Sequence, residues 1–367
     1  MGVDPQPMRR WISGIEPPHE LLASNGTQIF ELECREQPAR LLQLIHSYAT
    51  DAQIRAQFQS LRALVSKEGP VLFLGMGASF CSSISGSVLL QSKGRSSFSV
   101  DAGEWLYYGV PTWHSAPLSI LLTTSGESAE LVRLMKEGKE QALALICNNS
   151  ASQCWELSDK RLPILAGPEY GNATKSYTNA AAASIILASE LLDISWQQDA
   201  ESIVSSFSKC LDNALACRSD LEAFCRGAAN IEIIGRGPAY GAAFMGALCI
   251  RETAGLRAAA HTGAGFRHGP NLDVDASHVA VIFALGCVAD LGIKLAAECN
   301  RRGGKVILVS NREMHRTDIL YPVQLCAVPE AWEGLTSIVV PQALALAMIE
   351  RSGCRLPPRF EYGVMQE

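Results

Sequence analysis

A run of residues rich in hydroxyl groups could bind a phosphate. It reads Thr123-Thr124-Ser125-Gly126-Glu127-Ser128. The run follows an apolar segment at 118–122 and leads into a helical pattern that begins near residue 130. Hydroxyl groups and free backbone N–H groups at the positive end of a helix dipole suit an anion. We therefore predict that Thr123, Thr124, Ser125 and Ser128 bind a phosphate group.

The alternative is that this run simply caps a helix. Ser125 or Ser128 would then accept a hydrogen bond from a backbone N–H of the first helical turn. Two acids in the same stretch, Glu127 and Glu130, must also face away from the loop if it is to hold a phosphate.

A second loop, Gly75-Met76-Gly77-Ala78-Ser79, directly follows another apolar run. With Asp101 placed about where a ribose-binding acid would stand, it suggests a dinucleotide site. However, Phe80 occupies the position of the third glycine of that fingerprint, where a bulky side chain would crowd the helix against the strand. We favour a different interpretation. Ser79 joins the anion site, because loops at the carboxyl ends of neighbouring parallel strands face one crevice.

In the second half of the chain, Glu252 is a candidate general base. It lies with Arg251 in a helical pattern of small and apolar residues at 242–254. Burial among such residues raises the pKa of a carboxyl group towards neutrality, which suits proton transfer. The alternative is an ordinary surface glutamate near a helix end, and spacing alone favours that alternative.

A histidine completes the set of residues that could carry chemistry. The stretch around it reads Thr262-Gly263-Ala264-Gly265-Phe266-Arg267-His268-Gly269-Pro270. Its glycines and proline predict a tight loop that would fix the imidazole of His268 in place. Taken alone, the histidine fits a structural hydrogen-bonding role equally well.

The segments that must position these residues occur twice. Three apolar runs of the first half have counterparts 160 to 163 positions later. The pairs are 71–75 with 231–235, 118–122 with 278–282, and 142–146 with 305–309. Each run has the length and composition of a strand buried on both faces, and helical patterns separate the runs. This alternation predicts an α/β protein with two tandem doubly wound parallel-sheet domains that arose by duplication.

The remaining segments suggest boundaries for these domains. Helical patterns precede the first repeat at 30–47 and 51–66, and another covers 199–228. We predict an N-terminal helical segment (1–58), a first domain with the phosphate loop (59–198), a helical bridge (199–221), a second domain with Glu252 and His268 (222–355), and an extended C-terminal tail (356–367).

The composition excludes several classes of protein. Apolar residues make up 48% of the 367 and charged residues 19%, with a net charge of −6. No more than two Lys or Arg residues are adjacent, and residues 1–15 contain no apolar run typical of a signal peptide. The longest apolar stretch, at 338–349, is interrupted by Pro341 and Gln342 and is too short to span a bilayer. We expect a cytoplasmic protein that binds neither nucleic acid nor membranes.

The twelve cysteines do not indicate a metal site. They are scattered from Cys34 to Cys354 without a Cys-x-x-Cys pair, and the seven histidines lack the spacing of a zinc motif. We interpret them as small buried residues in a reducing compartment and predict that no metal is bound.

Taken together, these motifs resemble the double sugar-isomerase (SIS) domain proteins over residues 30–363. The type member is the isomerase half of glucosamine-6-phosphate synthase. The shared elements are Gly77-Ala78-Ser79, the Thr-Ser-Gly-Glu-Ser run, Glu169-Tyr170-Gly171-Asn172-Ala173-Thr174-Lys175, Gly246-Ala247-Leu248 with Arg251-Glu252, and Arg267-His268-Gly269-Pro270. Their order and spacing fit, apart from one residue missing near Asn172 to Thr174.

The resemblance implies a role for each matching residue. Ser79, Thr123, Thr124, Ser125 and Ser128 align with the sugar-phosphate pocket, and Gly77, Asn172, Ala173 and Thr174 with further substrate contacts. Glu252 aligns with the base that moves a proton between C1 and C2, and His268 with the histidine that opens the sugar ring. In relatives that histidine comes from a neighbouring subunit, which implies a homodimer with shared active sites. The chemistry requires no metal or organic cofactor.

Departures from the family pattern bear on the reaction. The first cysteine is Cys34, so no N-terminal cysteine nucleophile is available for glutaminase activity. The lysine that follows Pro-Arg in the synthase tail is absent here, since the last lysine of the chain is Lys305. Gly265 stands where relatives have a glutamate. We therefore expect a stand-alone phosphosugar isomerase, an amino-sugar phosphate deaminase or a deglycase. The alternative is a non-catalytic sugar-phosphate-binding regulator on the same fold.

Overall fold

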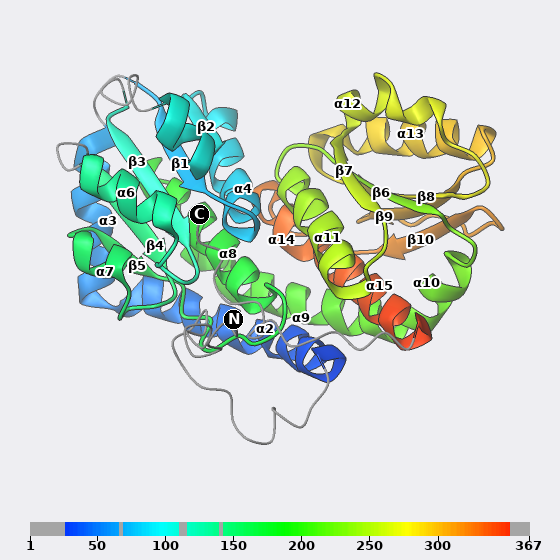
Figure 1. Ribbon diagram of the computed structural model, residues 1–367, viewed down its shortest axis with the longest axis horizontal. Helices are drawn as coiled ribbons and strands as arrows, with labels where there is room; N and C mark the ends of the chain where they lie inside the picture. The colour runs from blue at the N-terminus through cyan, green and yellow to red at the C-terminus, as the bar shows by residue number, and fades with distance from the viewer. Residues whose placement is uncertain (1–25, 66–68, 110–115, 139–141, 353–367) are drawn as a thin grey trace, which may run out of the picture. The chain divides into compact units, whose positions relative to one another are not determined.

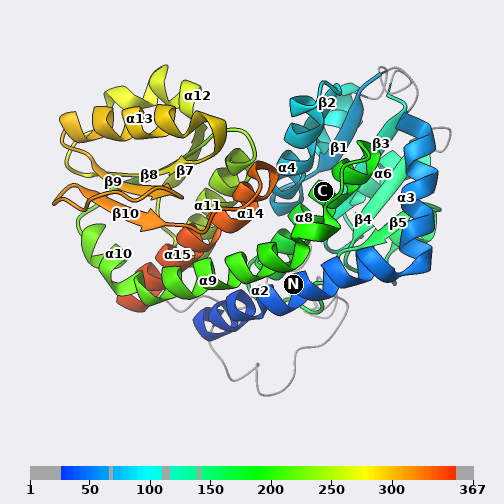
Figure 2. The same cartoon turned by 180° about the vertical axis from the view of Figure 1, so that it is seen from behind.

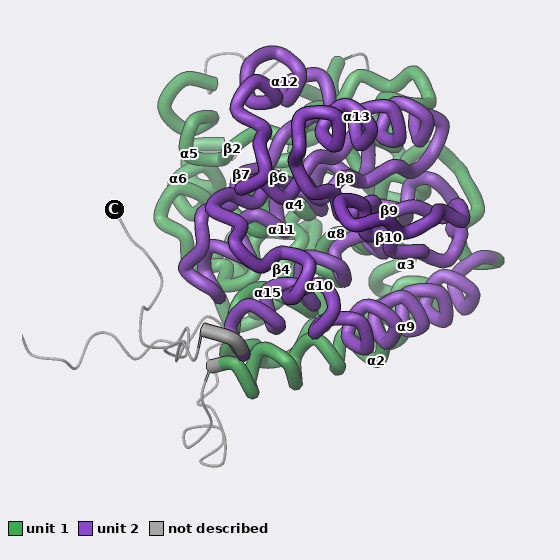
Figure 3. The backbone as a smooth tube through the Cα atoms, turned by 90° about the vertical axis from the view of Figure 1, so that its right-hand side faces the viewer, with its two compact units in different colours: residues 1–198, 355–367 green, residues 199–354 purple. Residues whose placement is uncertain are grey.

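The structure is a computed structural model that describes residues 26–65, 69–109, 116–138 and 142–352. The chain divides into two compact units, residues 1–198 with 355–367, and residues 199–354 (Figure 3). The predicted C-terminal tail at 356–367 lies outside the described residues, as do the first 25 residues of the predicted N-terminal segment.

The first unit is built on a five-stranded parallel sheet (Figure 1). Its strands are β1 (Val71–Gly75), β2 (Ser97–Asp101), β3 (Leu118–Thr123), β4 (Leu143–Cys147) and β5 (Arg161–Pro163), in the order β2-β1-β3-β4-β5. Every residue of β1 and β3 is buried, because helices cover both faces of these central strands.

Helices of the first unit form a layer on each face of this sheet. The helices are α2 (Gly26–Thr50), α3 (Ala52–Val65), α4 (Ala78–Ser92), α5 (Ala102–Glu104), α6 (Ala129–Glu137), α7 (Gln153–Leu157) and α8 (Lys175–Leu191). On one face α4 packs against α8, which also contacts α2 and α3. On the other face α6 and α7 cover a core that contains Leu74, Leu121 and Leu145. Figures 1 and 2 show these two layers from opposite sides.

The second unit repeats this architecture. Its strands are β6 (Asn230–Gly235), β7 (Ala258–Thr262), β8 (His278–Ala284), β9 (Lys305–Ser310) and β10 (Leu320–Gln324). Its helices are α9 (Ala200–Ala216), α10 (Arg218–Phe224), α11 (Ala239–Ala254), α12 (Gly263–Arg267), α13 (Ala289–Arg301), α14 (Glu333–Ser337) and α15 (Val339–Ser352). The strand order β7-β6-β8-β9-β10 is that of the first sheet, so the predicted pair of similar parallel-sheet domains is confirmed.

One stretch of continuous helix is long and apolar enough to cross a membrane. It spans the 21 residues Glu330–Glu350, because short helices before Pro341 run directly into α15. It is therefore longer than the apolar stretch predicted from the sequence, and length alone does not exclude a membrane span. All of its apolar window is buried inside the protein, as in the core helix of a globular domain.

Candidate functional site

The two predicted anion-binding loops lie next to each other at one edge of the first sheet. β1 pairs directly with β3 in a parallel register that places Leu74 opposite Leu121. The loop that carries Ser79 leaves the carboxyl end of β1, and the run that starts at Thr123 leaves the carboxyl end of β3. The strand order reverses between these two strands, and in doubly wound sheets ligands bind at that point.

Internal hydrogen bonds fix the shape of the hydroxyl-rich loop. The backbone N–H of Gly126 donates to Thr123 Oγ1 at 3.0 Å, and that of Glu127 donates to Ser125 Oγ at 3.2 Å. Both hydroxyl side chains are largely buried. A hydroxyl that accepts a hydrogen bond still has its own proton to donate. Thr123 and Ser125 are therefore oriented by the loop and able to donate to an anion.

Gly126 makes this compact loop possible. Its φ is +68°, which a residue with a side chain rarely adopts. A Cβ at this position would also lie 2.0 Å from Ser152 Oγ. The loop is therefore specific to glycine for both conformational and steric reasons.

The helix-capping interpretation does not fit the geometry of the loop. Ser128 occupies the N-cap position of α6, yet within the described part of the chain its side chain makes no capping hydrogen bond. The hydroxyl of Ser125 is bonded to the loop itself rather than to the helix. Thr124, Ser128 and Ser79 are all partly exposed, so each can reach a ligand.

Glu127 faces away from the anion-binding side, as a phosphate would require. Its carboxylate accepts hydrogen bonds from the backbone N–H of Gln153 at 3.2 Å and from Gln153 Nε2 at 3.3 Å. Gln153 is the first residue of α7, so the carboxylate lies at the N-terminus of that helix. The negative charge of Glu127 is thereby engaged outside the loop.

The acid that a dinucleotide site would need for the ribose is engaged elsewhere in the structure. The Asp101 carboxylate caps the short helix α5 by accepting hydrogen bonds from the backbone N–H groups of Gly103 and Glu104, at 2.9 and 3.2 Å. Asp101 is therefore a structural cap.

In the second unit, the chain's own carboxylates occupy the equivalent loop. Gly286 has a φ of +61° and stands 160 positions after Gly126. The backbone N–H of Cys287 donates to Glu330 Oε1 at 3.2 Å, and the backbone of Gly286 is bonded to Glu333. The N–H groups that bind hydroxyls in the first unit thus bind carboxylates in the second. The chain's own carboxyl groups therefore already occupy the N–H groups of this loop that a phosphate would need.

The buried carboxyl of Glu333 gives a testable pH dependence. Burial, together with the neighbouring Glu330, raises its pKa to about 7. The native state therefore holds this proton to a higher pH than the unfolded state. The stability that it contributes is complete below pH 4.5 and is lost as the pH rises to 7.

We expect Glu333→Gln to flatten the dependence of unfolding free energy on pH. Between pH 5 and 8 the free energy of unfolding should fall on the order of 2 kcal/mol further in the wild type than in the variant. Urea denaturation across this range measures the difference. Glu350→Gln, which removes a surface carboxylate paired with Arg218, is the control. Parallel curves for the wild type and Glu333→Gln would contradict the expectation.

The loop before α8 is held by a buried carboxylate of its own. Glu169 accepts hydrogen bonds from the backbone N–H groups of Thr174 and Ser176 and from both of their hydroxyls. The predicted substrate residue Thr174 therefore directs its hydroxyl inward, and Ala173 is buried. Asn172 differs, because its Nδ2 is shielded from solvent and has no hydrogen-bond partner among the described residues.

This loop lies at the same sheet edge as Ser79. The Ser184 hydroxyl of α8 donates to the carbonyl oxygen of Ser82 in α4 at 2.9 Å, and Tyr177 lies near Cys81. The early turns of the two helices are thus adjacent, and the helices run in the same direction. The first unit therefore gathers the predicted residues Gly77, Ser79, Asn172 and the hydroxyl-rich loop along one edge.

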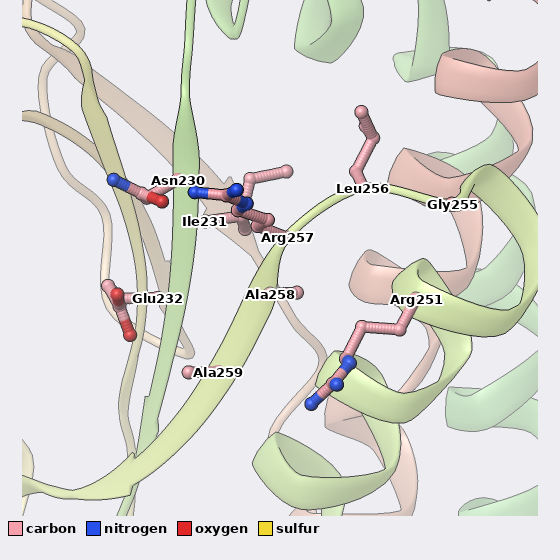
Figure 4. Close-up of a pocket in the computed structure, with 9 residues that line it drawn as sticks. All are labelled: Asn230, Ile231, Glu232, Arg251, Gly255, Leu256, Arg257, Ala258 and Ala259. Carbon is pink, nitrogen blue, oxygen red and sulfur yellow. The ribbon is translucent and has the colours of Figure 1, made fainter.

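Glu252 lies near the C-terminal end of α11 and is exposed. The preceding residue, Arg251, lines a pocket of about 400 Å³ beside the start of β7. Figure 4 shows Arg251 and Arg257 among the residues of this pocket, which also include Asn230, Glu232 and Leu256. Glu252 is therefore not the deeply buried acid that the apolar composition of its helix suggested.

His268 directly follows the short helix α12, where the sequence predicted a tight loop, and is exposed. The preceding Arg267 forms two hydrogen bonds with Glu298 of α13, each 3.0 Å long, which anchor this segment. Figures 1 and 2 show α12 and α13 on one face of the second sheet and α11 on the other. The helix that carries Glu252 and the helix that precedes His268 thus cover different faces of the second sheet.

No group of three His, Cys, Asp or Glu side chains that could hold a metal ion occurs within residues 26–65, 69–109, 116–138 and 142–352. The described cysteines are mostly buried, and burial raises the pKa of Cys147 to about 11 and of Cys225 to about 12.

Sequence comparison identifies the two repeated domains. The pattern of the SIS domain matches residues 64–189 and, a second time, residues 226–349. The chain belongs to the SIS-domain family. Each match covers one of the two parallel sheets described above, so this protein is a tandem SIS protein.

Relatives of this SIS protein act on sugar phosphates. A glutamine–fructose-6-phosphate aminotransferase (isomerizing) of Pyrococcus horikoshii is 29% identical over 341 residues, which are 89% of this chain and 55% of that protein. The SIS chain thus spans about half the length of the curated relatives it matches.

Solved structures share the fold. The tagatose-6-phosphate ketose/aldose isomerase of Escherichia coli matches with a TM-score of 0.77 and 21% identity, over 93% of the SIS chain and 97% of its own. The glucosamine-6-phosphate deaminase of Thermotoga maritima matches with a TM-score of 0.72 and 18% identity, over 92% and 99%.

Proposed function

We propose that this protein catalyses aldose–ketose isomerisation of a phosphorylated sugar or amino sugar, with or without loss of the amine. The observation that carries the proposal is the contrast between the two loops at Gly126 and Gly286. The first offers oriented hydroxyl donors, and the second is filled by carboxylates. One unit is thereby suited to a phosphate group, whose binding energy would position the reacting carbons.

The proposed chemistry needs one base and an open-chain sugar. By family resemblance, Glu252 removes the proton from C2 of the aldose, and the electron pair of that C–H bond forms the C1=C2 bond of a cis-enediol(amine). The carbonyl oxygen gains a proton at this step. Glu252 then returns a proton to C1, while the oxygen or nitrogen on C2 loses one and becomes the ketose carbonyl or its imine. His268 assists ring opening, and hydrolysis of the imine would release the amine.

We infer that the two catalytic side chains of one active site come from two chains. Figures 1 and 2 show α11, which carries Glu252, and α12, which His268 directly follows, on opposite faces of the second sheet. A second copy of the chain that presents its exposed His268 would complete the site. The minimal active unit is then a homodimer, which agrees with the family resemblance.

Exchange of substrate protons with solvent tests the proposed function. The protein is incubated in D₂O with fructose 6-phosphate, glucosamine 6-phosphate or a ketosamine 6-phosphate, and the C1 and C2 protons are followed by NMR. We expect deuterium to enter at these carbons of one substrate, and the accumulating product to separate isomerase, deaminase and deglycase. Binding of these sugars without exchange would instead favour a regulator.

Removal of the Ser125 hydroxyl should weaken binding of the phosphorylated substrate. Ser125→Ala deletes a buried donor from the loop, and we expect about a tenfold rise in KM with kcat changed less than about threefold. Steady-state kinetics with the substrate identified above give both constants. Ser92→Ala, at the exposed end of α4, is the control. An unchanged KM in Ser125→Ala would argue against phosphate binding by this loop.

A further inference from the structure

A carboxyl group of α2 that the predicted site does not include contacts the substrate loop. Glu33 is only 2% exposed, although it is an ionisable residue. Its two carboxyl oxygens accept the backbone N–H groups of Tyr170 and Gly171, the latter at 3.0 Å. α2 thus fixes the backbone of the two residues that directly precede Asn172.

The contact leaves little room for a side chain at position 171. A Cβ on Gly171 would lie 2.7 Å from Glu33 Oε2, so a larger residue would displace this carboxyl group. At the other end of the loop, Glu169 holds Thr174 and Ser176, and Lys175 is paired with Glu36 of α2. The loop is therefore tethered on both sides of Asn172.

The side-chain amide nitrogen of Asn172, which lies between these tethers, is left without a partner among the described residues. Asn172 Nδ2 is buried and, in the part of the chain that the structure describes, donates to nothing. A buried amide donor without an acceptor is unfavourable by about 1–3 kcal/mol. A loop held this firmly around such a donor is suited to receive an acceptor from outside the chain, and a sugar supplies hydroxyl and carbonyl oxygens.

We propose that Glu33 is a positioning residue for substrate binding, which fixes the 170–171 backbone so that Asn172 Nδ2 donates to an oxygen of the sugar. This inference rests on the proposed function. It adds a residue outside the SIS domain pattern, which begins at residue 64, and assigns α2 a part in substrate binding.

The electrostatic surroundings of Glu33 give the proposal a pH signature. The charged or titratable groups near it are Glu169, Lys175 with its partner Glu36, and the Tyr170 hydroxyl. Burial, and next the Glu169 carboxylate, raise the pKa of Glu33 to about 8. The hydrogen bonds from Tyr170 and Gly171 lower this pKa, but the net shift is upward. The folded arrangement around Glu33 is therefore favoured while Glu33 is protonated, and this contribution is complete below pH 4.5 and is lost as the pH rises to 8.

Three variants test the role of Glu33. Glu33→Ala removes both acceptors, and Glu33→Gln keeps the size and one carbonyl oxygen but cannot ionise. Glu31→Ala, two positions away on α2, removes an acid that pairs with Arg35 on the surface and is the control. KM and kcat are measured from pH 6.5 to 8.5, and hydrogen–deuterium exchange of the peptide containing Tyr170 and Gly171 is measured without substrate.

At pH 7 we expect Glu33→Ala to raise KM about tenfold while kcat changes less than about threefold, because binding geometry rather than chemistry is affected. Glu33→Gln should stay within about threefold of the wild-type KM. Relative to Glu33→Gln, the wild-type KM should rise with pH. Exchange at Tyr170 and Gly171 should be faster in Glu33→Ala than in the wild type and in Glu31→Ala.

The results separate this inference from the proposed function. If the wild type turns over a sugar phosphate but both Glu33 variants keep its KM and pH profile, the positioning role is wrong. The same conclusion follows if Glu31→Ala raises KM equally. Should Glu33→Ala not fold, the pH profile of Glu33→Gln decides alone. If amide hydrogen exchange at Tyr170 and Gly171 were faster in Glu33→Ala but the wild type turned over no sugar phosphate, the proposed function would be overturned. The contact between Glu33 and the loop would still be supported.

Discussion

Glu252→Gln should reduce turnover by about 10³-fold, within the 10²–10⁴-fold range that a positioned acid–base group contributes. The substitution keeps the size of the side chain and removes its ability to accept a proton. Substrate binding should survive, because the proposed phosphate loop belongs to the other unit. Deuterium wash-in at C1 and C2, measured beside the affinity for the same sugar phosphate, records both properties.

The controls for this prediction separate a specific base from a general effect of charge. Glu201→Gln removes an exposed carboxylate from α9 of the same unit and should leave turnover unchanged. Glu252→Asp should retain more activity than Glu252→Gln, because a shorter base still accepts protons. If Glu252→Gln incorporated deuterium at C1 and C2 at the wild-type rate, Glu252 would be excluded as the base. The alternative of a non-catalytic regulator would then have to be considered again.

Mixing two inactive variants should restore activity. Glu252→Gln and His268→Ala should each be nearly inactive as pure homodimers, because every shared site lacks one group. In a hybrid dimer, one site combines the intact Glu252 of one chain with the intact His268 of the other. Random mixing makes half of the dimers hybrid, so we expect about a quarter of wild-type activity to return. Unfolding and refolding the two variants together, followed by an activity assay, measures this recovery.

The amount recovered discriminates between arrangements of the site. Were both groups contributed by one chain, no hybrid would contain an intact site, and activity would stay at the level of the variants. Mixing each variant with itself is the matched control for losses during refolding. The prediction follows from the placement of α11 and α12 on opposite faces of one sheet.

The central part of the fold follows from the sequence because the inner strands are buried on both faces. β1, β3, β4, β6, β8 and β9 are mostly apolar, and their repetition at offsets of 160 to 163 positions indicates a duplication. The sequence analysis did not identify the outer strands. β2 and β7 carry small or polar residues, and β5 has only three residues. At a sheet edge, pairing to a neighbour rather than burial defines the strand.

Predictability within the site has a similar limit. The hydroxyl-rich loop was predictable, because its residue types occur together and directly follow a strand. Glu33 gave no such signal, since its contact with Tyr170 and Gly171 joins segments more than 130 positions apart. The same holds for Glu330 and Glu333, whose acid side chains are unremarkable until the fold places them beside Gly286. The local sequence pattern predicts which polar groups a loop carries. Tertiary packing determines which residues from distant segments form hydrogen bonds with them.

The loop at Gly286, whose N–H groups bind Glu330 and Glu333, bears on how many phosphate groups one chain can bind. Duplication gives the chain two copies of the turn at which a doubly wound sheet binds ligands, yet a free phosphomonoester would have to displace Glu330 and Glu333 from the second. Those carboxylates are tethered at a high local concentration and cannot diffuse away. A titration with a phosphomonoester should therefore saturate at one equivalent per chain.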